Sequence, residues 1–393
     1  MSHRRFRISL TFEGACFAGI AVFILAGALT RQINLLMVLF GLLAGAFFMH
    51  WRMVTKMLRN MEVARRLPKS VSAGDLLVVE LTGVNARRRL GAWSVVATDT
   101  VCREDERGAR PVRARALFSY VPAGATRNTN YRGRLAQRGR YRFGPLQLSS
   151  RFPFGFLQYR MRFDAYETML VFPRLGRLTA GWRRWQDGLE TRLGSSSPRQ
   201  GFLEGDFYGL RDWRSGDSRR WLHWRTSARR QTPVVRQFEQ QRDRGLAVVL
   251  ELWQPDRPGP AESDAVEMAV SFVATLVDEL CRAGGRGLCV AIAGRPGWLV
   301  DAPASAALLE EVMCQLASSE ATSDDTLPQT LSNVFDRIRR GTQTLIVSTR
   351  TVDLDDERRF ALLCHDGQRR KWLSRLKTVN SSDSSLSELF QVS

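Results

Sequence analysis

Two apolar runs near the N-terminus constrain this chain more than any other feature. Residues 15–29 carry no polar side chain, and residues 33–49 carry only Asn34. Each run is shorter than the roughly 20 residues of a membrane-spanning helix, but flanking residues in the headgroup region can supply the missing turn. Only residues 30–32 separate the two runs. The pattern predicts an antiparallel transmembrane helical hairpin within residues 1–66.

A cleavable signal peptide and a buried soluble hairpin are the alternatives. The small residues at 26–28 resemble a cleavage site, but a second apolar run directly after it argues against cleavage. A soluble hairpin needs a polar stripe for its solvent face, and neither run has one. Basic residues precede the first run and follow the second, and only Arg31 lies between them. This asymmetry predicts that both termini face the cytoplasm.

Composition narrows the choice of partners. The net charge of the 393-residue chain is +19, and nearly all of its basic residues are arginine. A basic body beside an anionic leaflet gains electrostatic attraction, so membrane lipid is the expected partner of this charge. The arginines follow no zinc-finger or RNA-binding pattern, so nucleic acid is a less favoured partner than lipid. It is kept as an alternative. The six cysteines and four histidines lack metal-ligand spacing, so we expect no metal, no cofactor and no disulfide.

Two further domains follow the hairpin. Residues 67–180 read as short strands between turn signals, which predicts a β-sandwich-like domain. Residues 246–380 alternate buried strands with helices, which predicts a doubly wound α/β domain with a parallel sheet. The serine-rich residues 381–393 are expected to form a disordered tail. The strands expected in the two domains span residues 76–81, 93–97, 114–120, 139–148, 168–172, 246–252, 288–293 and 344–348, and the helices span 263–282, 304–317 and 331–340.

Residues 181–245 link the two domains and hold the densest motif of the chain. Asp217 is a good N-cap, so a short helix is expected from Ser218 onwards. Trp224 and Ala228 would then share one face of this helix. The motif combines charged, aromatic and glycine residues at Gly205, Asp206, Arg211, Asp212, Gly216, Asp217, Arg220, Trp224, Ala228 and Arg229.

This run resembles the hallmark of the bacterial family catalogued as domain of unknown function fifty-eight. Residues 138–145, 151–155 and 169–173 also match the strands and the turn that precede the hallmark in that family. The resemblance implies a membrane hairpin, a β domain and a C-terminal domain similar to von Willebrand factor type A domains. Members are commonly encoded beside MoxR-type AAA+ ATPases. The implied role is a scaffold or adaptor in the bacterial inner membrane, where the hallmark is structural or binds a partner.

The resemblance also implies a place for a metal ion. Metal-binding type A domains end their first strand with Asp-x-Ser-x-Ser, and residues 251–255 match that position here. Glu251 could replace the aspartate, but Trp253 and Pro255 offer no side-chain oxygen. Hard cations such as Mg²⁺ need oxygen ligands. The sequence therefore argues against a bound Mg²⁺.

No enzyme motif is present. The chain lacks a P-loop, a zinc-protease helix, a nucleophile elbow and a dinucleotide-binding glycine pattern. His223 could be paired with Asp212 or Asp217 for acid–base chemistry, but a helix histidine between tryptophans is more often a packing residue. We expect a non-enzymatic interaction protein without a small-molecule substrate. A divalent-metal-dependent binding module and a basic nucleic-acid-binding protein are the alternatives.

Overall fold

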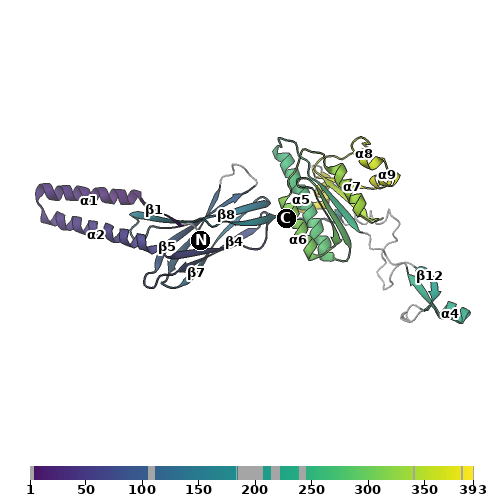
Figure 1. Cartoon of the computed structure of the whole chain (residues 1–393), viewed down its shortest axis with the longest axis horizontal. Coiled ribbons are helices and arrows are strands. Elements are labelled where there is room, and N and C mark those ends of the chain that lie inside the picture. The colour runs from purple at the N-terminus through teal and green to yellow at the C-terminus, as the bar shows by residue number, and fades with distance from the viewer. Residues whose placement is uncertain are drawn as a thin grey trace. The chain divides into compact units, whose positions relative to one another are not determined.

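The chain forms two compact units, Met1–Arg174 and Leu175–Ser393 (Figure 1). The computed structural model describes residues 4–104, 111–182, 184, 207–213, 222–238, 245–339, 341–381 and 384–392. The first unit combines the apolar hairpin with a β-sandwich, and the second contains an α/β domain.

The larger sheet of the sandwich is built around one long strand. Strand β8 (Gly139–Ser150) pairs along one side with β5 (Ala92–Arg103), and β5 pairs with β6 (Val112–Val121). On its other side, β8 pairs first with β10 (Glu167–Phe172) and then with β9 (Leu157–Phe163). All these pairs are antiparallel. The five strands predicted within residues 67–180 are confirmed, and the strands at 71–72, 126–134, 157–163 and 176–178 were not predicted.

A second, antiparallel sheet packs against the first. It has the order β2 (Met61–Arg66), β4 (Leu76–Asn85) and β7 (Thr126–Arg134), while the short β3 (Val71–Ser72) extends the first sheet beside β10. Along β4, buried residues alternate with outward-facing ones, as expected for a strand with one face on a core. One continuous core joins both sheets through residues such as Leu77, Val79, Leu81, Val95, Phe143 and Leu148.

A buried polar network ties the two sheets together. Arg65 of β2 donates to both carboxylate oxygens of Asp99 on β5, at 2.8 and 2.7 Å, and to the Phe143 carbonyl at 3.2 Å. The Tyr131 hydroxyl of β7 donates to Asp99 at 2.7 Å. The side chain of Asp99 is 0% exposed and that of Arg65 is 2% exposed. Burial and the charge of Asp99 raise the pKa of Tyr131 far above its usual range, so its hydroxyl keeps its proton.

The apolar hairpin is inserted between two strands of the sandwich. Strand β1 (Arg4–Leu10) precedes helix α1 (Phe12–Arg31) and pairs antiparallel with β9. Helix α2 (Asn34–Met57) leads directly into β2. The predicted boundary at residue 66 is therefore wrong, because residues 4–10 and 61–66 supply one strand to each sheet. Removing residues 1–66 would delete both strands and not only an anchor.

The hairpin docks on the turn that precedes β9. Thr11 caps α1 by accepting from the Gly14 amide at 3.0 Å, and its own amide donates to the Phe156 carbonyl at 3.0 Å. A Cβ at position 14 would collide with this carbonyl, so only glycine allows the approach. The fully buried His50 of α2 accepts from the Leu157 amide at 3.0 Å. Both helices are thus bonded to the sandwich at one end.

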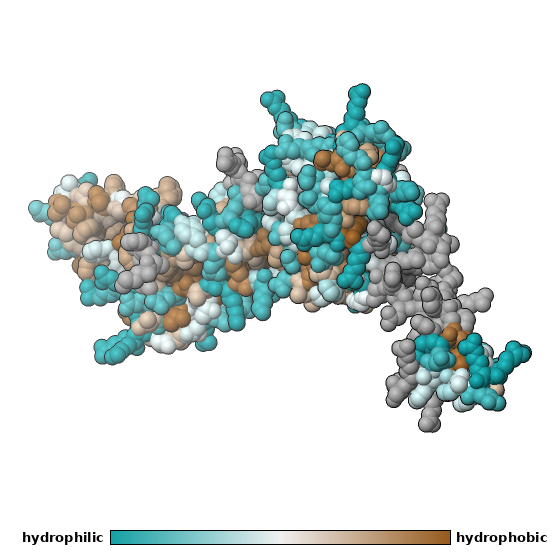
Figure 2. Space-filling model, turned by 45° about the vertical axis from the view of Figure 1, so that its right-hand side comes forward, coloured by the Kyte–Doolittle hydropathy of each residue, from teal (hydrophilic) through white to brown (hydrophobic). Residues whose placement is uncertain are grey.

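Beyond this junction, the hairpin exposes apolar side chains. Helices α1 and α2, of 20 and 24 residues, have the length and composition of membrane spans. Phe23 is 80% exposed, Leu35 is 75% exposed and Leu42 is 68% exposed. Figure 2 shows hydrophobic atoms gathered over this hairpin. A soluble hairpin would bury such residues, so the exposure favours insertion in a bilayer.

The second unit contains a five-stranded sheet whose central strand is β14 (Leu246–Glu251). Parallel neighbours flank it, β15 (Gly287–Ala293) on one side and β17 (Gln343–Ser348) on the other. Parallel β18 (Lys377–Asn380) and antiparallel β16 (Trp298–Pro303) form the edges. The three predicted buried strands are confirmed, and the two edge strands were not predicted.

Helices cover both faces of this sheet (Figure 1). Helices α7 (Leu327–Arg337), α8 (Ala361–Cys364) and α9 (Gly367–Leu373) pack on the face that carries alternate residues of β14, β15 and β17. Helix α5 (Pro260–Ala283) contacts β14, β17 and α6 (Ala306–Ser318) on the other side. The domain is therefore a three-layer α/β fold with a mostly parallel sheet.

Residues 384–392 are ordered, whereas the sequence predicted a disordered tail over 381–393. Helix α10 (Ser384–Leu389) leads to β19 (Phe390–Val392), which pairs antiparallel with β11 (Gly176–Leu178). Phe390 is buried and meets Phe272 edge-on at 5.7 Å between ring centroids. The serine-rich composition led to the wrong prediction. Three apolar residues, Leu386, Leu389 and Phe390, are buried and anchor this end of the chain.

Candidate functional site

Open α/β sheets bind ligands outside the carboxyl ends of their strands, at the point where the connections of neighbouring strands lead in opposite directions. Here that point is the carboxyl end of β14. Its register places Glu251, the last residue of β14, beside Ser348, the last residue of β17. After β14, the chain passes through α5 to β15, which is the neighbour of β14 on one side. It later passes through α7 to β17, which is the neighbour on the other side. We call this region the carboxyl-edge site.

Glu251 lies at its centre and is 2% exposed. Its Oε1 accepts from Nε and Nη2 of Arg350 at 3.0 and 2.6 Å and from Nη2 of Arg359 at 2.8 Å. Its Oε2 accepts from the Ser348 hydroxyl at 2.5 Å. A buried carboxylate is costly unless it is paired and hydrogen-bonded, and these donors satisfy both oxygens.

A second carboxylate, Asp325, completes this ionic cluster. It accepts from Nη2 of Arg350 at 2.6 Å and from Nε and Nη2 of Arg359 at 2.8 and 2.9 Å. Partial burial would raise the pKa of Asp325, but the hydrogen bond and charge of Arg359, followed by those of Arg350, hold it below its usual range. Two carboxylates face two guanidinium groups, so the charges of the cluster balance.

The loop after β14 is held against the loop after β17. The Trp253 amide donates to Thr349 Oγ1 at 3.0 Å, and this hydroxyl donates to the Trp253 carbonyl at 2.6 Å. The indole N–H donates to the Ser323 carbonyl at 3.1 Å. The Arg350 guanidinium carbon lies 4.8 Å from the indole centroid, which adds a cation–π contact. Hydrogen bonds to its backbone and to its indole therefore fix the position of Trp253.

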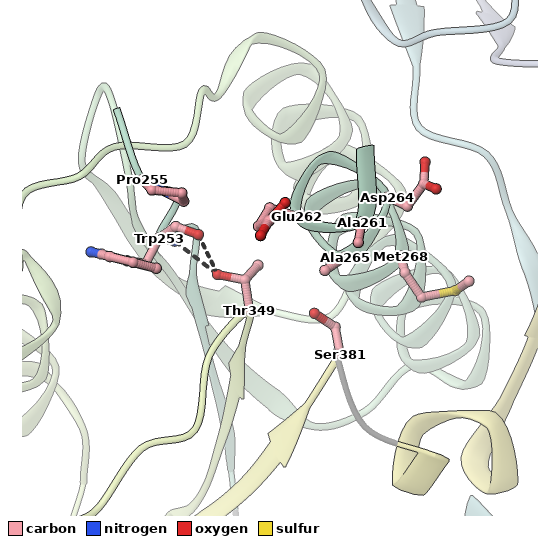
Figure 3. Close-up of a pocket in the computed structure, with 9 residues that line it drawn as sticks. All are labelled: Trp253, Pro255, Ala261, Glu262, Asp264, Ala265, Met268, Thr349 and Ser381. Atoms are coloured by element: carbon pink, nitrogen blue, oxygen red, sulfur yellow. Dashed lines mark hydrogen bonds between the residues drawn. The ribbon is translucent and has the colours of Figure 1, made fainter. Parts of the chain in front are cut away.

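A cavity of about 460 Å³ opens beside these loops (Figure 3). Its walls come from the end of β14, the start of α5, the end of β17 and the residue that follows β18. In Figure 3, the Glu262 carboxylate extends from α5 toward Thr349 and Trp253. The lining residues are Trp253, Pro255, Ala261, Glu262, Asp264, Ala265, Met268, Thr349 and Ser381.

The carboxyl-edge site does not fit a divalent cation. Glu251 was the only predicted candidate ligand, and its oxygens accept from two guanidinium groups and a hydroxyl. Within the described part of the chain, no three histidine, cysteine or acidic side chains form a group that could hold a metal. The positive charge beside the Glu251 carboxylate comes from the two guanidinium groups. Sequence reasoning did not identify Arg350 or Arg359, although Arg350 follows a predicted buried strand by two residues.

Three of the described cysteines, Cys281, Cys289 and Cys314, lie in surroundings that lower their reactivity. None forms a disulfide. Burial raises the pKa of Cys289 to about 12, and burial also raises the pKa values of Cys281 and Cys314. Because the thiolate is the reactive form, these three thiols are poor nucleophiles at neutral pH.

In the signature segment, the described residues 207–213 and 222–238 form a small hairpin with a helix. Strands β12 (Phe207–Asp212) and β13 (Val234–Phe238) pair antiparallel. Helix α4 (Trp224–Arg230) is attached to β13 by the Val234 amide, which donates to Ser227 Oγ at 2.9 Å. Five of the predicted signature residues, Arg211, Asp212, Trp224, Ala228 and Arg229, lie here. The other five, Gly205, Asp206, Gly216, Asp217 and Arg220, lie outside the described residues.

Helix α4 begins later than predicted. Leu222 forms an isolated β-bridge with Val235, so a continuous helix from residue 218 to residue 228 is wrong. His223 is the N-cap, and its Nδ1 accepts from the Thr226 amide at 3.3 Å. The helix has no buried residue, and Trp224 is 71% exposed. The predicted cap, Asp217, lies outside the described residues.

Comparisons with known proteins support the resemblance of this chain to the DUF58 family. The family model "Protein of unknown function DUF58" matches residues 209–366. "Uncharacterized protein YeaD" of Bacillus subtilis (strain 168) is 26% identical over 239 residues, which are 59% of this chain. The match covers 56% of that protein's length, so the chain spans just over half of this relative. Neither description states a function.

Similarities to solved structures are partial. A β-glucosidase from Listeria innocua is 16% identical with a TM-score of 0.20, and the match covers 28% of this chain and 16% of that one. A superoxide reductase (neelaredoxin) from Ignicoccus hospitalis is 13% identical with a TM-score of 0.20, covering 30% of this chain and 86% of that one. At such scores, these similarities carry no argument about fold or function.

Proposed function

We propose that this protein is a membrane-anchored, non-enzymatic scaffold or adaptor that acts with a MoxR-type AAA+ ATPase. The observation that carries the proposal is the insertion of two exposed apolar helices into a sandwich whose sheets they join. This arrangement suits a tether that holds a binding body at a membrane. The charged groups of the cluster at the carboxyl-edge site are paired with one another, which suits a binding role better than catalysis.

The α/β domain is proposed to be of the von Willebrand factor type A kind. Its mostly parallel sheet, its helices on both faces and its loops at the carboxyl edge support this proposal. Ligand binding in such sheets is expected at that edge. The exposed side chains of α4 support a contact surface for the signature segment as well. The metal-dependent alternative is not favoured, because guanidinium groups bond the carboxylate that would hold the ion.

We propose an inner-membrane location with both termini in the cytoplasm. Strands β1 and β2 belong to one sandwich, so both ends of the hairpin start from the same side of the bilayer. Basic residues flank these ends, and Arg31 lies at the far turn. Lipid headgroups are then the partners of the basic residues near the junction.

Protease added outside intact spheroplasts is expected to leave the sandwich and the α/β unit uncut, because the membrane would shield them. Disrupting the membrane should make both units accessible. The control is a chain with a protease site inserted after Gln32, which should be cut from outside at the hairpin turn. Digestion of either unit in intact spheroplasts would contradict the proposed orientation.

Purification of the full chain in a mild detergent should recover an AAA+ ATPase. Mass spectrometry of the eluate would identify it, and an unrelated two-helix membrane protein of equal abundance is the control. The interaction should survive in moderate salt if a shaped surface and not bulk charge holds it. Repeated absence of an ATPase, together with a neighbouring gene that encodes none, would remove this partner from the proposal.

A further inference from the structure

We propose that the end of the β-sandwich next to the hairpin itself binds the surface of the bilayer, through aromatic and basic side chains that contact anionic lipid headgroups. This inference rests on the proposed membrane location and adds a second contact with the membrane. Figure 1 shows α1 and α2 leaving the sandwich at one end. At that end lie two loops, residues 86–91 and 151–156, with Trp93 at the start of β5 and Tyr120 near the end of β6. We call this surface the membrane platform.

Both loops of the membrane platform contact α2 near its C-terminal end. In the first loop, Arg87 Nη1 donates to the Lys56 carbonyl at 2.9 Å. In the second, the Phe154 ring lies 6.0 Å from the His50 ring between centroids. Along α2, His50 lies about 24 Å and Lys56 about 33 Å from Asn34. The hydrocarbon core of a bilayer is about 30 Å thick. The two loops therefore reach the level of the inner headgroups when α2 spans the bilayer.

The loop of residues 151–156 carries aromatic contacts from the hairpin into the sandwich. Its Phe156 ring stacks on Phe17 of α1 at 4.1 Å between centroids and lies 5.5 Å from the Phe154 ring. Its Phe152 ring stacks on Trp93 of β5 at 5.8 Å. The apolar surface of the hairpin is therefore continuous with that of the membrane platform, and a bilayer that surrounds the first also meets the second.

The membrane platform exposes the residue types that are enriched at membrane–water interfaces. The rings of Trp93 and Tyr120 lie 4.1 Å apart between centroids, and both side chains are exposed. Leu90 and Phe154, one in each loop, are exposed as well. Tryptophan and tyrosine favour the headgroup level, because their rings are apolar while their N–H and O–H groups form hydrogen bonds. A bilayer surface would cover these side chains, which water leaves uncovered.

The charge of the membrane platform selects the kind of lipid. Arg88 and Arg89 are exposed in the first loop, and Arg151 is exposed in the second. Neither loop contains an acidic residue, although Glu13 of α1 interacts electrostatically with Arg151. An anionic leaflet attracts such a basic cluster, whereas a zwitterionic one does not. The membrane platform is therefore expected to prefer anionic lipid.

The test uses the full chain in liposomes, with a coumarin amino acid introduced by codon suppression in place of Leu90 or of Leu76. Leu76 is the matched control, because it is 54% exposed, Leu90 is 50% exposed, and Leu76 begins β4 at its other end, about 30 Å from Asn85. The liposomes contain phosphatidylcholine, about one third phosphatidylglycerol and a lipid with a nitroxide on its headgroup. Quenching at position 90 should be at least about twofold stronger than at position 76. Equal quenching would overturn the proposal and leave the exposed surface to a protein partner.

Variants separate the membrane platform from the general charge of the chain. Arg88→Gln with Arg89→Gln should reduce quenching at position 90 about twofold in the anionic liposomes and leave it unchanged in pure phosphatidylcholine. Arg113→Gln with Arg115→Gln is the matched control, because these exposed residues lie toward the other end of β6 and give the same change of charge. Phe154→Ser should reduce quenching in both kinds of liposome, since an apolar contact does not depend on lipid charge. Equal reductions by the two arginine double variants would contradict the proposal.

Extraction of the same liposomes with alkaline carbonate tests the proposed anchor separately. If the chain stays in the membrane while positions 90 and 76 are quenched equally, the transmembrane hairpin stands and the membrane platform fails. If carbonate removes the chain although position 90 is quenched more strongly at neutral pH, the membrane platform stands as a peripheral lipid contact and the hairpin anchor fails. Retention of the chain together with stronger quenching at position 90 supports both.

Discussion

Asp99→Ala is expected to destabilise the β-sandwich by about 3–5 kcal/mol, the usual cost of removing one partner from a buried ion pair. The change leaves the guanidinium of Arg65, which is 2% exposed, without its bidentate partner. It also leaves the Tyr131 hydroxyl without its acceptor. Hydrogen exchange of peptides from β5 and β8 in the full chain should become roughly 10²- to 10⁴-fold faster.

An exposed pair in the same sandwich provides the matched control. Asp164 accepts from Arg162 at 2.8 Å, but the arginine side chain is 47% exposed. Asp164→Ala should therefore cost less than about 1 kcal/mol. Replacing the whole network by Arg65→Met, Asp99→Leu and Tyr131→Phe should recover most of the loss, because no buried charge remains. Equal effects of Asp99→Ala and Asp164→Ala would contradict the assigned role of the network.

Glu251→Ala is expected to destabilise the α/β domain by about 3–5 kcal/mol. Without this carboxylate, Arg350 and Arg359 share only Asp325, and the partly buried cluster carries an unbalanced positive charge. The Ser348 hydroxyl also loses its acceptor. Peptides from β14 and β17 should exchange faster, while peptides from the sandwich should keep their rates. This contrast assigns the loss to one domain of the full chain.

Glu357→Ala is the control for this second change. Glu357 pairs with Arg370 at 2.5 Å in the same domain, but both side chains are 65% exposed. Solvent screening limits such a pair to about 0–1 kcal/mol. If Glu251→Ala cost no more than Glu357→Ala, the cluster at the carboxyl edge would not hold the domain together, and the charge-balance argument would fail.

Local patterns predicted the elements whose signal lies within a few neighbouring residues. The apolar runs at 15–29 and 33–49 became α1 and α2, because uninterrupted apolar composition is sufficient to indicate such helices. The buried strands β14, β15 and β17 were equally readable from continuous runs. Edge strands β16 and β18 were not, because they mix polar and apolar residues and depend on a neighbour for their hydrogen bonds.

The site was predictable only in part. The sequence drew attention to Glu251 and to the missing oxygen ligands at Trp253 and Pro255. It did not reveal that Arg350 and Arg359 bond the same carboxylate, since these residues lie 99 and 108 positions from Glu251. The position of Arg350, two residues after a buried strand, was the one available signal.

Sequence alone therefore determined the apolar hairpin, the strand-rich middle and the alternating strands and helices, because hydropathy and periodicity act over short distances along the chain. Tertiary structure alone decided that β1 and β2 join the hairpin to both sheets, that residues 384–392 are ordered, and that two arginines bond the carboxylate of Glu251. Each of these outcomes depends on contacts between distant segments, whose pairing is selected by the burial of apolar surface and the neutralisation of buried charge in the folded state.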